Sequence, residues 1–441
     1  MYKFTISAPG RVFLSGDPTR YNKLCIAASL DQRTKLIFSL TPKAQNEGHI
    51  EINFTSIRLY ARIPLSATES FFELGCNNQL TEANLRNLVR NFVDQLSREV
   101  FGRSDNYDCN DRAHLLSLQA FFLLLILVSR GDQIWVYTQS SWSVKISTKL
   151  PIGGGLGGSA SFATCLAACF YRWLFRKDVF NQRDLSRIRY YVQKCERIIF
   201  KSPTRLIDSV ISVYGSIHVF ENAWPTNERL RYYNIERIGK EIPGMKIALV
   251  YSNVHKLISE QNKQMESMKQ SFPFIKSIQS NIDNVVNKFK DILENTELMI
   301  GQRGLLEVQK LDYLKDGYVQ LAVNFILQTS ILSIYCATEN FIHLLTYTLQ
   351  KLIRMNQGLL RALGMSHPNL DVICNVITPL LSISFAGKLA NNGGGGYAFI
   401  LLSPDSPDAH IDPIVNAYKL HNFTAEITKL NCKGVRNEPT L

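Results

Sequence analysis

The chain has 441 residues, of which 46% are apolar and 20% are charged, and its formal net charge is +12. This length allows two or three domains, and the composition is typical of a soluble globular enzyme or binding protein. Lysine and arginine are spread along the chain without a dense basic run, which argues against a nucleic acid partner.

The nine cysteines form no CxxC pair, and their number is odd. This pattern argues against a disulfide framework or a zinc site and favours a reducing compartment. No signal peptide is recognised at the N-terminus. The most apolar segment, residues 115–128, falls short of the roughly 20 residues needed to span a bilayer. We therefore expect a buried helix there, no membrane insertion and a cytoplasmic protein.

The first half of the chain alternates between strand and helix patterns. Residues 1–60 carry short alternating runs, which predict strands joined by turns. Residues 82–130 follow a helical pattern, and residues 134–148 end in a strand with Trp142, Val144 and Ile146 on one face. Helical spacing returns over residues 159–175 and again over residues 184–200.

The second half begins with a Pro-Gly turn and a strand over residues 244–252. We place a domain boundary just before this strand, which gives domains 1–240 and 241–441. Mostly helical residues follow up to residue 363, then a short apolar strand, the glycine cluster "NNGGGG" and two closing elements. The sequence therefore predicts an α+β protein of two domains.

The stretch "LPIGGGLGGSA" puts five glycines between a predicted strand and a predicted helix. This arrangement aims free N–H groups and the positive end of a helix at an anion. Glycines let the backbone close on phosphate oxygens. No Lys-Ser/Thr pair follows at Walker spacing, and no short βαβ unit supports a dinucleotide fingerprint. The turn therefore predicts a polyphosphate ligand with magnesium.

This turn resembles the second motif of the GHMP kinases. "SAPGRVFLSGD" and "KLANNGGGGYAFIL" resemble their first and third motifs, in the same chain order. "LDQRT", "LIDSVISVYGS" and "MNQGLLRALGMSHPNLD" are similar to segments of the mevalonate kinases within that superfamily. The resemblance implies a two-domain fold, with a left-handed βαβ unit in the N-terminal domain and a ferredoxin-like C-terminal domain.

The same resemblance implies an activity. It is the ATP-dependent phosphorylation of the primary hydroxyl of mevalonate, a step of isoprenoid and sterol synthesis, with Mg²⁺ as cofactor. The site would lie between the two domains, and a homodimer is a possible assembly.

Asp208 is the residue that the resemblance implies would orient or deprotonate the attacking hydroxyl. Its apolar sequence neighbours also make a surface position hard to explain, although a helix cap is an alternative. Arg11 stands beside it where the family has lysine. Ser159 and Glu196 are the implied Mg²⁺ ligands, since Mg²⁺ prefers a few oxygens. The alternative for Glu196 is a solvated helix face.

The remaining site residues are also implied by the resemblance. The nucleotide-binding residues are those of the glycine turn with two hydroxyls and one arginine: Gly153, Gly154, Gly155, Leu156, Gly157, Gly158, Ser159, Thr148, Ser56 and Arg11. The substrate-binding residues are Asp17, Asp208, Gly394 and Gly395.

The sequence departs from the family mainly on the substrate side. Arg11 keeps the charge of the lysine, but its fork could pair bidentately with Asp208. Pro18 replaces a histidine, the lid threonine becomes Ser259 at best, and residues 390–392 replace Thr-Gly-Ala. Two alternatives therefore stay open. One is another GHMP kinase acting on a small carboxylate or sugar, and the other is a catalytically weak homologue acting as a nucleotide or metabolite sensor.

Overall fold

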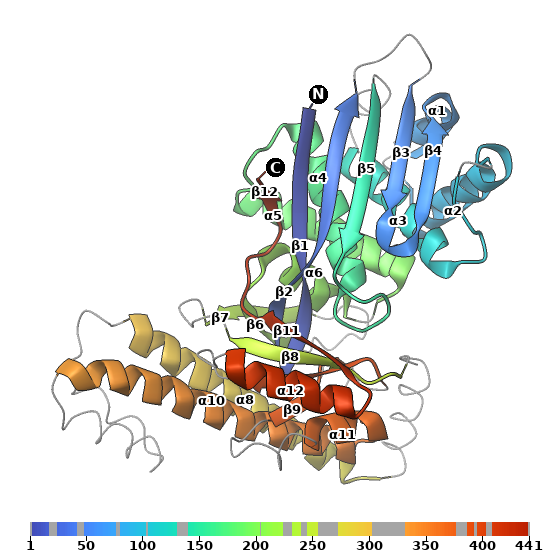
Figure 1. Ribbon diagram of the computed structural model, residues 1–441. Helices are drawn as coiled ribbons and strands as arrows, with labels where there is room; N and C mark the ends of the chain where they lie inside the picture. The colour runs from blue at the N-terminus through green and yellow to red at the C-terminus, as the bar shows by residue number, and fades with distance from the viewer. Residues whose placement is uncertain are drawn as a thin grey trace.

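The computed structural model describes residues 2–16, 24–41, 48–75, 80–102, 105–129, 140–202, 204–223, 232–239, 245–254, 272–301, 331–375, 386–391, 395–402 and 408–439. Within these residues the chain forms two β-sheets flanked by helices (Figure 1). The predicted α+β class is confirmed.

In the described part of the chain, the larger sheet has eight strands: β1 (Tyr2–Gly16), β2 (Leu24–Thr41), β3 (His49–Phe54), β4 (Leu59–Pro64), β5 (Ser141–Thr148), β6 (Ile217–Ala223), β7 (Tyr232–Ile238) and β12 (Arg436–Glu438). Their order is β12-β1-β2-β5-β3-β4, and the β6–β7 hairpin pairs with the first half of β2. β3 and β5 run parallel, so a crossover joins them. The left-handedness predicted for the βαβ unit of this domain stays a prediction.

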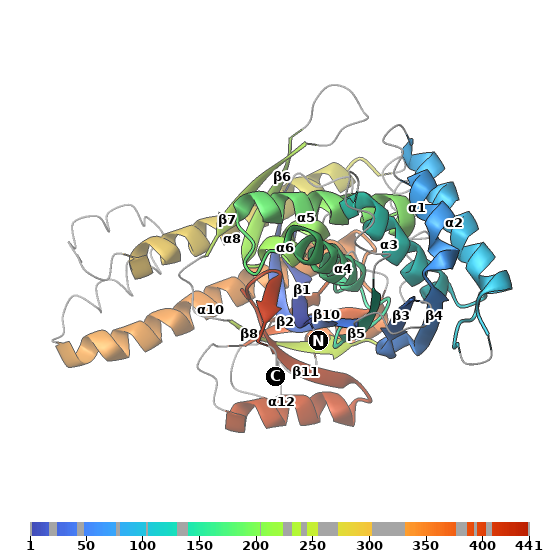
Figure 2. The same cartoon turned by 90° about the horizontal axis from the view of Figure 1, so that it is seen from above.

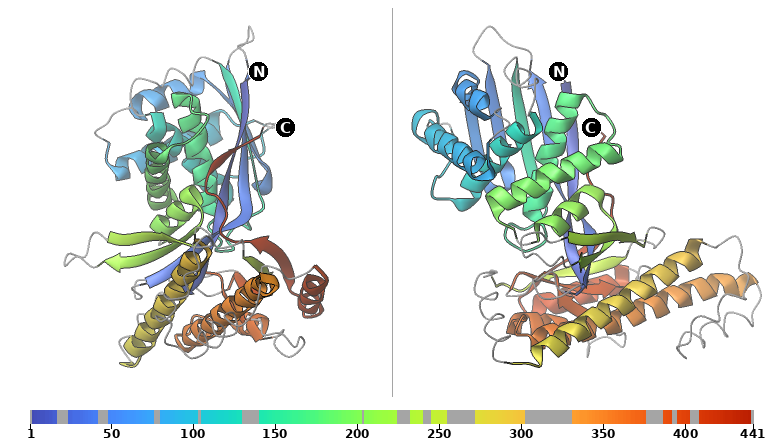
Figure 3. Two further views of the ribbon diagram at one scale, coloured as in Figure 1. Left: turned by 90° about the vertical axis from the view of Figure 1, so that its left-hand side faces the viewer. Right: turned by 180° about the vertical axis from the view of Figure 1, so that it is seen from behind.

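Helices cover one face of this sheet (Figure 2 and Figure 3). They are α1 (Glu69–Gly75), α2 (Glu82–Glu99), α3 (Arg112–Ser129), α4 (Gly158–Phe175), α5 (Gln182–Cys195) and α6 (Arg205–Tyr214). Three short helical turns accompany them: η1 (Thr55–Ile57), η2 (Ser66–Thr68) and the π-turn η4 (Glu196–Phe200). A capping box between Asn181 and Asp184 fixes the start of α5.

The apolar segment of residues 115–128 lies within α3. By length and composition this helix could cross a membrane, but 72% of it is buried inside the protein. Phenylalanine and leucine side chains of α3 pack between the sheet and the neighbouring helices. The expectation of a buried core helix is confirmed.

The smaller sheet has the strands β8 (Lys246–Tyr251), β9 (Ala386–Leu389), β10 (Tyr397–Leu402) and β11 (Thr424–Lys429), in the order β11-β8-β10-β9. Its helices are α8 (Ile275–Gly301), α10 (Ile331–Ala362), α11 (Pro368–Asn375) and α12 (Asp408–Leu420). α8 and α10 run side by side below the sheet (Figure 1). All pairs in this sheet are antiparallel, and the order is that of a ferredoxin-like unit, as predicted.

The long strand β1 contributes to both cores. Phe4 and Ile6 pack in the core under the larger sheet, whereas Val12 and Leu14 pack with the smaller sheet and its helices. The pairing with β2 changes register between Pro9 and Arg11. Bulges of this kind re-aim side chains and often lie next to active sites. Arg11 therefore sits where the strand passes from one core to the other.

The end of the chain returns to the larger sheet. β12 pairs with β1 around Ile6, and the Ser7 hydroxyl donates a hydrogen bond to Glu438 across 2.6 Å. The buried Arg33 donates to the carbonyl oxygens of Lys433 and Gly434. The predicted boundary at residue 240 lies outside the described residues, and the division into domains 1–240 and 241–441 stays a prediction.

Candidate active site

A buried ion pair joins Arg11 of β1 to Asp208 in the first turn of α6. Nε of Arg11 lies 2.6 Å from Oδ1 of Asp208, and the two side chains are only 6% and 4% exposed. Removing two charges from water is unfavourable, so a buried ion pair is weak evidence for stability. We therefore consider this pair for its chemistry.

Arg11 also reaches the glycine turn. Its Nη1 donates a hydrogen bond to the carbonyl oxygen of Gly155, and its guanidinium lies over the ring of Phe13, 4.4 Å from the centroid. The bidentate pairing with Asp208 expected from the sequence is therefore wrong. Nε alone contacts the carboxylate, because Nη1 is committed to the turn.

The second oxygen of Asp208 is held by hydroxyl groups. Thr204, one turn earlier, donates to Oδ2 across 2.7 Å, and Ser202 lies 3.5 Å from the same atom. Among the described residues, this carboxylate accepts no hydrogen bond from a backbone N–H, so Asp208 is not a helix cap. Sequence reasoning missed Thr204 and Ser202, although a hydroxyl four residues before a helical aspartate is a usable signal.

Glu196 begins the π-turn η4 and is fully buried. The predicted helix over residues 184–200 is thus only partly right, because the α-helix ends at Cys195 and a π-turn follows. A π-turn takes up one residue more than an α-turn, and such turns are frequent at functional sites. The alternative of a solvated helix face for Glu196 is wrong.

The Glu196 carboxylate lacks a hydrogen-bond partner at either oxygen among the described residues. Burial, together with the negative charge of Asp208, raises its pKa to about 8. Three groups act against this shift and lower the pKa: the hydroxyls of Ser159 and Ser202 and the charge of Arg11. Neither hydroxyl makes a well-formed hydrogen bond to the Glu196 carboxylate. An unpaired buried carboxylate of this kind is unusual and calls for a cation.

The glycine turn presents free N–H groups on one side. Gly153, Gly155 and Gly157 have φ values of 74°, 76° and 75°, and α4 begins directly after them. Among the described residues, the N–H groups of Gly155, Leu156 and Gly157 have no hydrogen-bond partner. Alternating conformations of this kind form a nest for an anion, beside the positive end of a helix.

Known proteins resemble this chain in sequence and in fold. The family described as "GHMP kinases N terminal domain" matches residues 128–216. Mouse mevalonate kinase is 24% identical, and the match covers 98% of this chain and 94% of the mouse protein. The comparisons thus relate residues 128–216 to the GHMP kinases and the whole chain to mevalonate kinases.

Solved structures of GHMP kinases share the fold over the full length. The mevalonate kinase of Methanococcus jannaschii has a TM-score of 0.60 at 15% identity and covers 98% of this chain and 99% of its own. The L. major mevalonate kinase in complex with R-mevalonate has a TM-score of 0.59 at 14% identity, with 98% and 97% covered.

The other predicted site residues are placed as follows. Ser56 of η1 meets Thr148 at the end of β5, where the Ser56 hydroxyl accepts a hydrogen bond from the Thr148 N–H across 3.0 Å. Gly395 has a φ of 115° and lies against the backbone of Val254. Asp17 and Gly394 lie outside the described residues, as do Pro18 and Ser259.

The residues predicted to hold Mg²⁺ fit a hard cation. Ser159 lies in the first turn of α4, close enough for its hydroxyl to affect the pKa of Glu196. Among the described residues, no group of three or more His, Cys, Asp or Glu side chains could hold a metal ion. A metal here would therefore depend on these two oxygen donors and on oxygens of the nucleotide, which is the usual manner of Mg²⁺.

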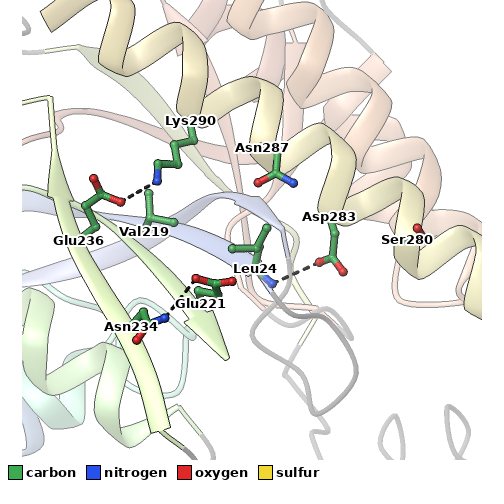
Figure 4. Close-up of a pocket in the computed structure, with 9 residues that line it drawn as sticks. All are labelled: Leu24, Val219, Glu221, Asn234, Glu236, Ser280, Asp283, Asn287 and Lys290. Atoms are coloured by element: carbon green, nitrogen blue, oxygen red, sulfur yellow. Dashed lines mark hydrogen bonds and ion pairs between the residues drawn. The ribbon is translucent and has the colours of Figure 1, made fainter. Parts of the chain in front are cut away.

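A separate pocket of about 380 Å³ lies between the β6–β7 hairpin and α8 (Figure 4). Its polar groups are largely paired with one another. Lys290 binds Glu236 at 2.6 Å, and Asn234 donates to Glu221 across 3.3 Å. None of the predicted site residues lines it, so this pocket is not part of the candidate active site.

Proposed function

We propose that this GHMP kinase transfers a phosphoryl group from ATP to the primary hydroxyl of mevalonate, which gives 5-phosphomevalonate for isoprenoid and sterol synthesis. The observation that carries the proposal is the position of Arg11, which contacts both Asp208 and the glycine turn. A cation held between an acceptor-activating carboxylate and a phosphate-binding turn supplies positioning and charge stabilisation, which are the main needs of phosphoryl transfer. The choice of mevalonate rests on the full-length likeness to mevalonate kinases.

On the acceptor side, Asp208 would orient the attacking hydroxyl and accept its proton. Thr204 fixes one carboxylate oxygen and Arg11 the other, so the carboxylate cannot rotate freely. Arg11 would stabilise the negative charge that builds on the attacking oxygen, because its charge is held in place without water. Asp17, Gly394 and Gly395 are the proposed acceptor-binding residues.

On the donor side, the N–H groups of the glycine turn would hold phosphate oxygens, and Ser56 and Thr148 would line the nucleotide. Ser159 and Glu196 would hold Mg²⁺, which when bound neutralises charge on the transferred phosphate. The unpaired oxygens of Glu196 support this assignment.

We also propose that the two domains are residues 1–240 and 241–441 and that the protein is cytoplasmic.

The test is an ADP-release assay of the purified protein with mevalonate, phosphomevalonate, homoserine and galactose in parallel. We expect release that depends on mevalonate and on Mg²⁺. Release with galactose or homoserine instead would show a GHMP kinase with another acceptor. Binding of ATP without release in any arm would favour the nucleotide sensor.

A further inference from the structure

The carbonyl groups of the glycine turn are held from outside the turn. The carbonyl of Leu156 accepts the backbone N–H of Arg11 across 2.9 Å, and the carbonyl of Gly155 accepts Nη1 of the same residue. The carbonyl of Gly154 accepts Nδ2 of Asn391 across 3.3 Å. The carbonyls of Gly154, Gly155 and Leu156 are thus turned to one side of the turn. The N–H groups of the same three peptides, which belong to the next residues, are left on the other side.

Unlike Arg11, Asn391 comes from the smaller sheet, where it lies just after β9. It is 237 residues away from Gly154 in sequence. Its side chain is buried and fills the space beside two glycines. A Cβ atom at Gly155 would collide with its Nδ2, and a Cβ atom at Gly396 would lie 2.8 Å from the same atom. Both glycines also have a positive φ, so the amide packs against two positions where the backbone itself already favours glycine.

We propose that Asn391 is a positioning residue for nucleotide binding, which sets the orientation of the Gly154 peptide from the second sheet and so couples the smaller sheet to the phosphate-binding turn. This inference rests on the proposed function, because it takes the turn to be the site of the ATP phosphates. Asn391 acts through the turn, since its amide contacts the carbonyl side of Gly154.

The consequence differs from that of a packing residue. Without the Asn391 amide, the Gly154 peptide gains freedom to rotate, and the nest must be ordered again when phosphate binds. One neutral hydrogen bond of this kind corresponds to about a fivefold to tenfold change in affinity. The proposed acceptor-binding groups do not include Asn391, so acceptor binding should change little.

The experiment measures MgADP and MgATP dissociation constants by calorimetry for the parent, Asn391→Ala and Asn391→Asp. Asp has the shape of Asn but places an oxygen where Nδ2 donates, so it should repel the Gly154 carbonyl. We expect both variants to bind nucleotide about fivefold to tenfold more weakly, with Asp no better than Ala. The Michaelis constant for the acceptor should stay within about twofold of the parent.

Gln350→Ala is the matched control, because the buried Gln350 amide also donates to a backbone carbonyl in the smaller sheet, that of Leu401 at 2.9 Å. It should lower thermal stability without changing nucleotide affinity.

A second control tests the contact itself. Gly155→Ala should reduce nucleotide affinity less in an Asn391→Gly background than in the parent, because the collision with Nδ2 is gone while the φ strain stays.

Parental affinity in folded Asn391→Ala would overturn the inference while leaving the proposed function in place. Equal losses in Gln350→Ala and Asn391→Ala would reduce Asn391 to a stabilising residue and overturn it as well. A parent protein that binds no nucleotide would overturn the proposed function itself.

Discussion

Arg11 and Asp208 form an ion pair through Nε and Oδ1, 2.6 Å apart, while a second nitrogen of the same guanidinium holds the carbonyl of Gly155. A lysine ammonium is a single charged group at the end of a flexible chain, whereas a guanidinium presents donors in a fixed fork. Arginine at this position can therefore hold the carboxylate and the turn simultaneously.

The first prediction concerns the charge of Arg11. In Arg11→Ala, kcat/KM for the acceptor should fall by an amount that corresponds to about 3 kcal/mol of lost transition-state stabilisation. This is the loss expected when one preorganised charged contact is removed from a dry site. Arg11→Lys should recover part of the loss. Steady-state kinetics of the three proteins measures this, and melting curves show how far the unpaired Asp208 destabilises the Ala variant.

Parental kcat/KM in Arg11→Ala would remove Arg11 from the mechanism. A silent parent that becomes active as Arg11→Lys would instead identify a homologue that has lost catalysis.

The second prediction separates chemistry from binding at Asp208. Asp208→Asn keeps the shape: its single carbonyl oxygen can still accept from Arg11, and its Nδ2 can donate to the Thr204 hydroxyl, but it is no base. We expect kcat to fall below detection while the MgATP dissociation constant stays within about twofold of the parent. Asp184→Asn is the control, because Asp184 is also buried and binds the Tyr171 hydroxyl far from the turn. It should lose stability and keep activity, whereas appreciable kcat in Asp208→Asn would contradict the assignment.

The third prediction follows from the raised pKa of Glu196. In the folded, metal-free protein this pKa is about 8, above the ordinary value of 4.5. Between these values the unfolded chain has released the proton and the folded chain has kept it. The folded state is therefore favoured at low pH, and its stability falls as pH rises, by about 1.4 kcal/mol per pH unit from this group alone.

Denaturant unfolding of the metal-free parent and of Glu196→Gln, at pH values from about 5 to about 8, checks this slope. The parent should lose stability relative to the Gln variant across this range. Parallel curves would show that Glu196 is already ionised. Mg²⁺ binding near neutral pH should also release a proton from the parent and not from Glu196→Gln.

The fourth prediction uses two glycines with nearly the same backbone angles. A Cβ atom at Gly153 would meet nothing within 4 Å, whereas one at Gly155 would collide with Asn391. Alanine at either position is strained at its positive φ, at about 1 kcal/mol. Gly155→Ala should therefore weaken MgATP binding much more than Gly153→Ala. Parental MgATP affinity of Gly155→Ala in calorimetry would argue against the turn as the phosphate site.

The sequence was sufficient to predict the parts of the site that are carried by local motifs. Strand, glycine turn and helix follow one another between β5 and α4, and the apolar neighbours of Asp208 correctly indicated that it is buried. The π-turn at Glu196 could not be predicted, because residues 184–200 have the periodicity of one continuous helix. The backbone changes to a π-turn at Glu196, whose carboxylate is buried.

Contacts between distant segments likewise could not be predicted from the sequence. The replacement of the third-motif residues at 390–392 was visible, but nothing near Asn391 indicates that its amide reaches Gly154. Pairing of β12 with β1 has no local signal either, because three residues of ordinary composition form the last strand.

That last strand also has a consequence for how the protein is made. Ser7 and Glu438 are 431 residues apart in sequence, and yet their side chains meet. On the ribosome β1 emerges first, so its outer edge stays without a partner until residues 436–438 have been synthesised. An open strand edge can recruit a strand from another molecule. During translation this edge is therefore open to pairing with another molecule until β12 covers Thr5, Ile6 and Ser7.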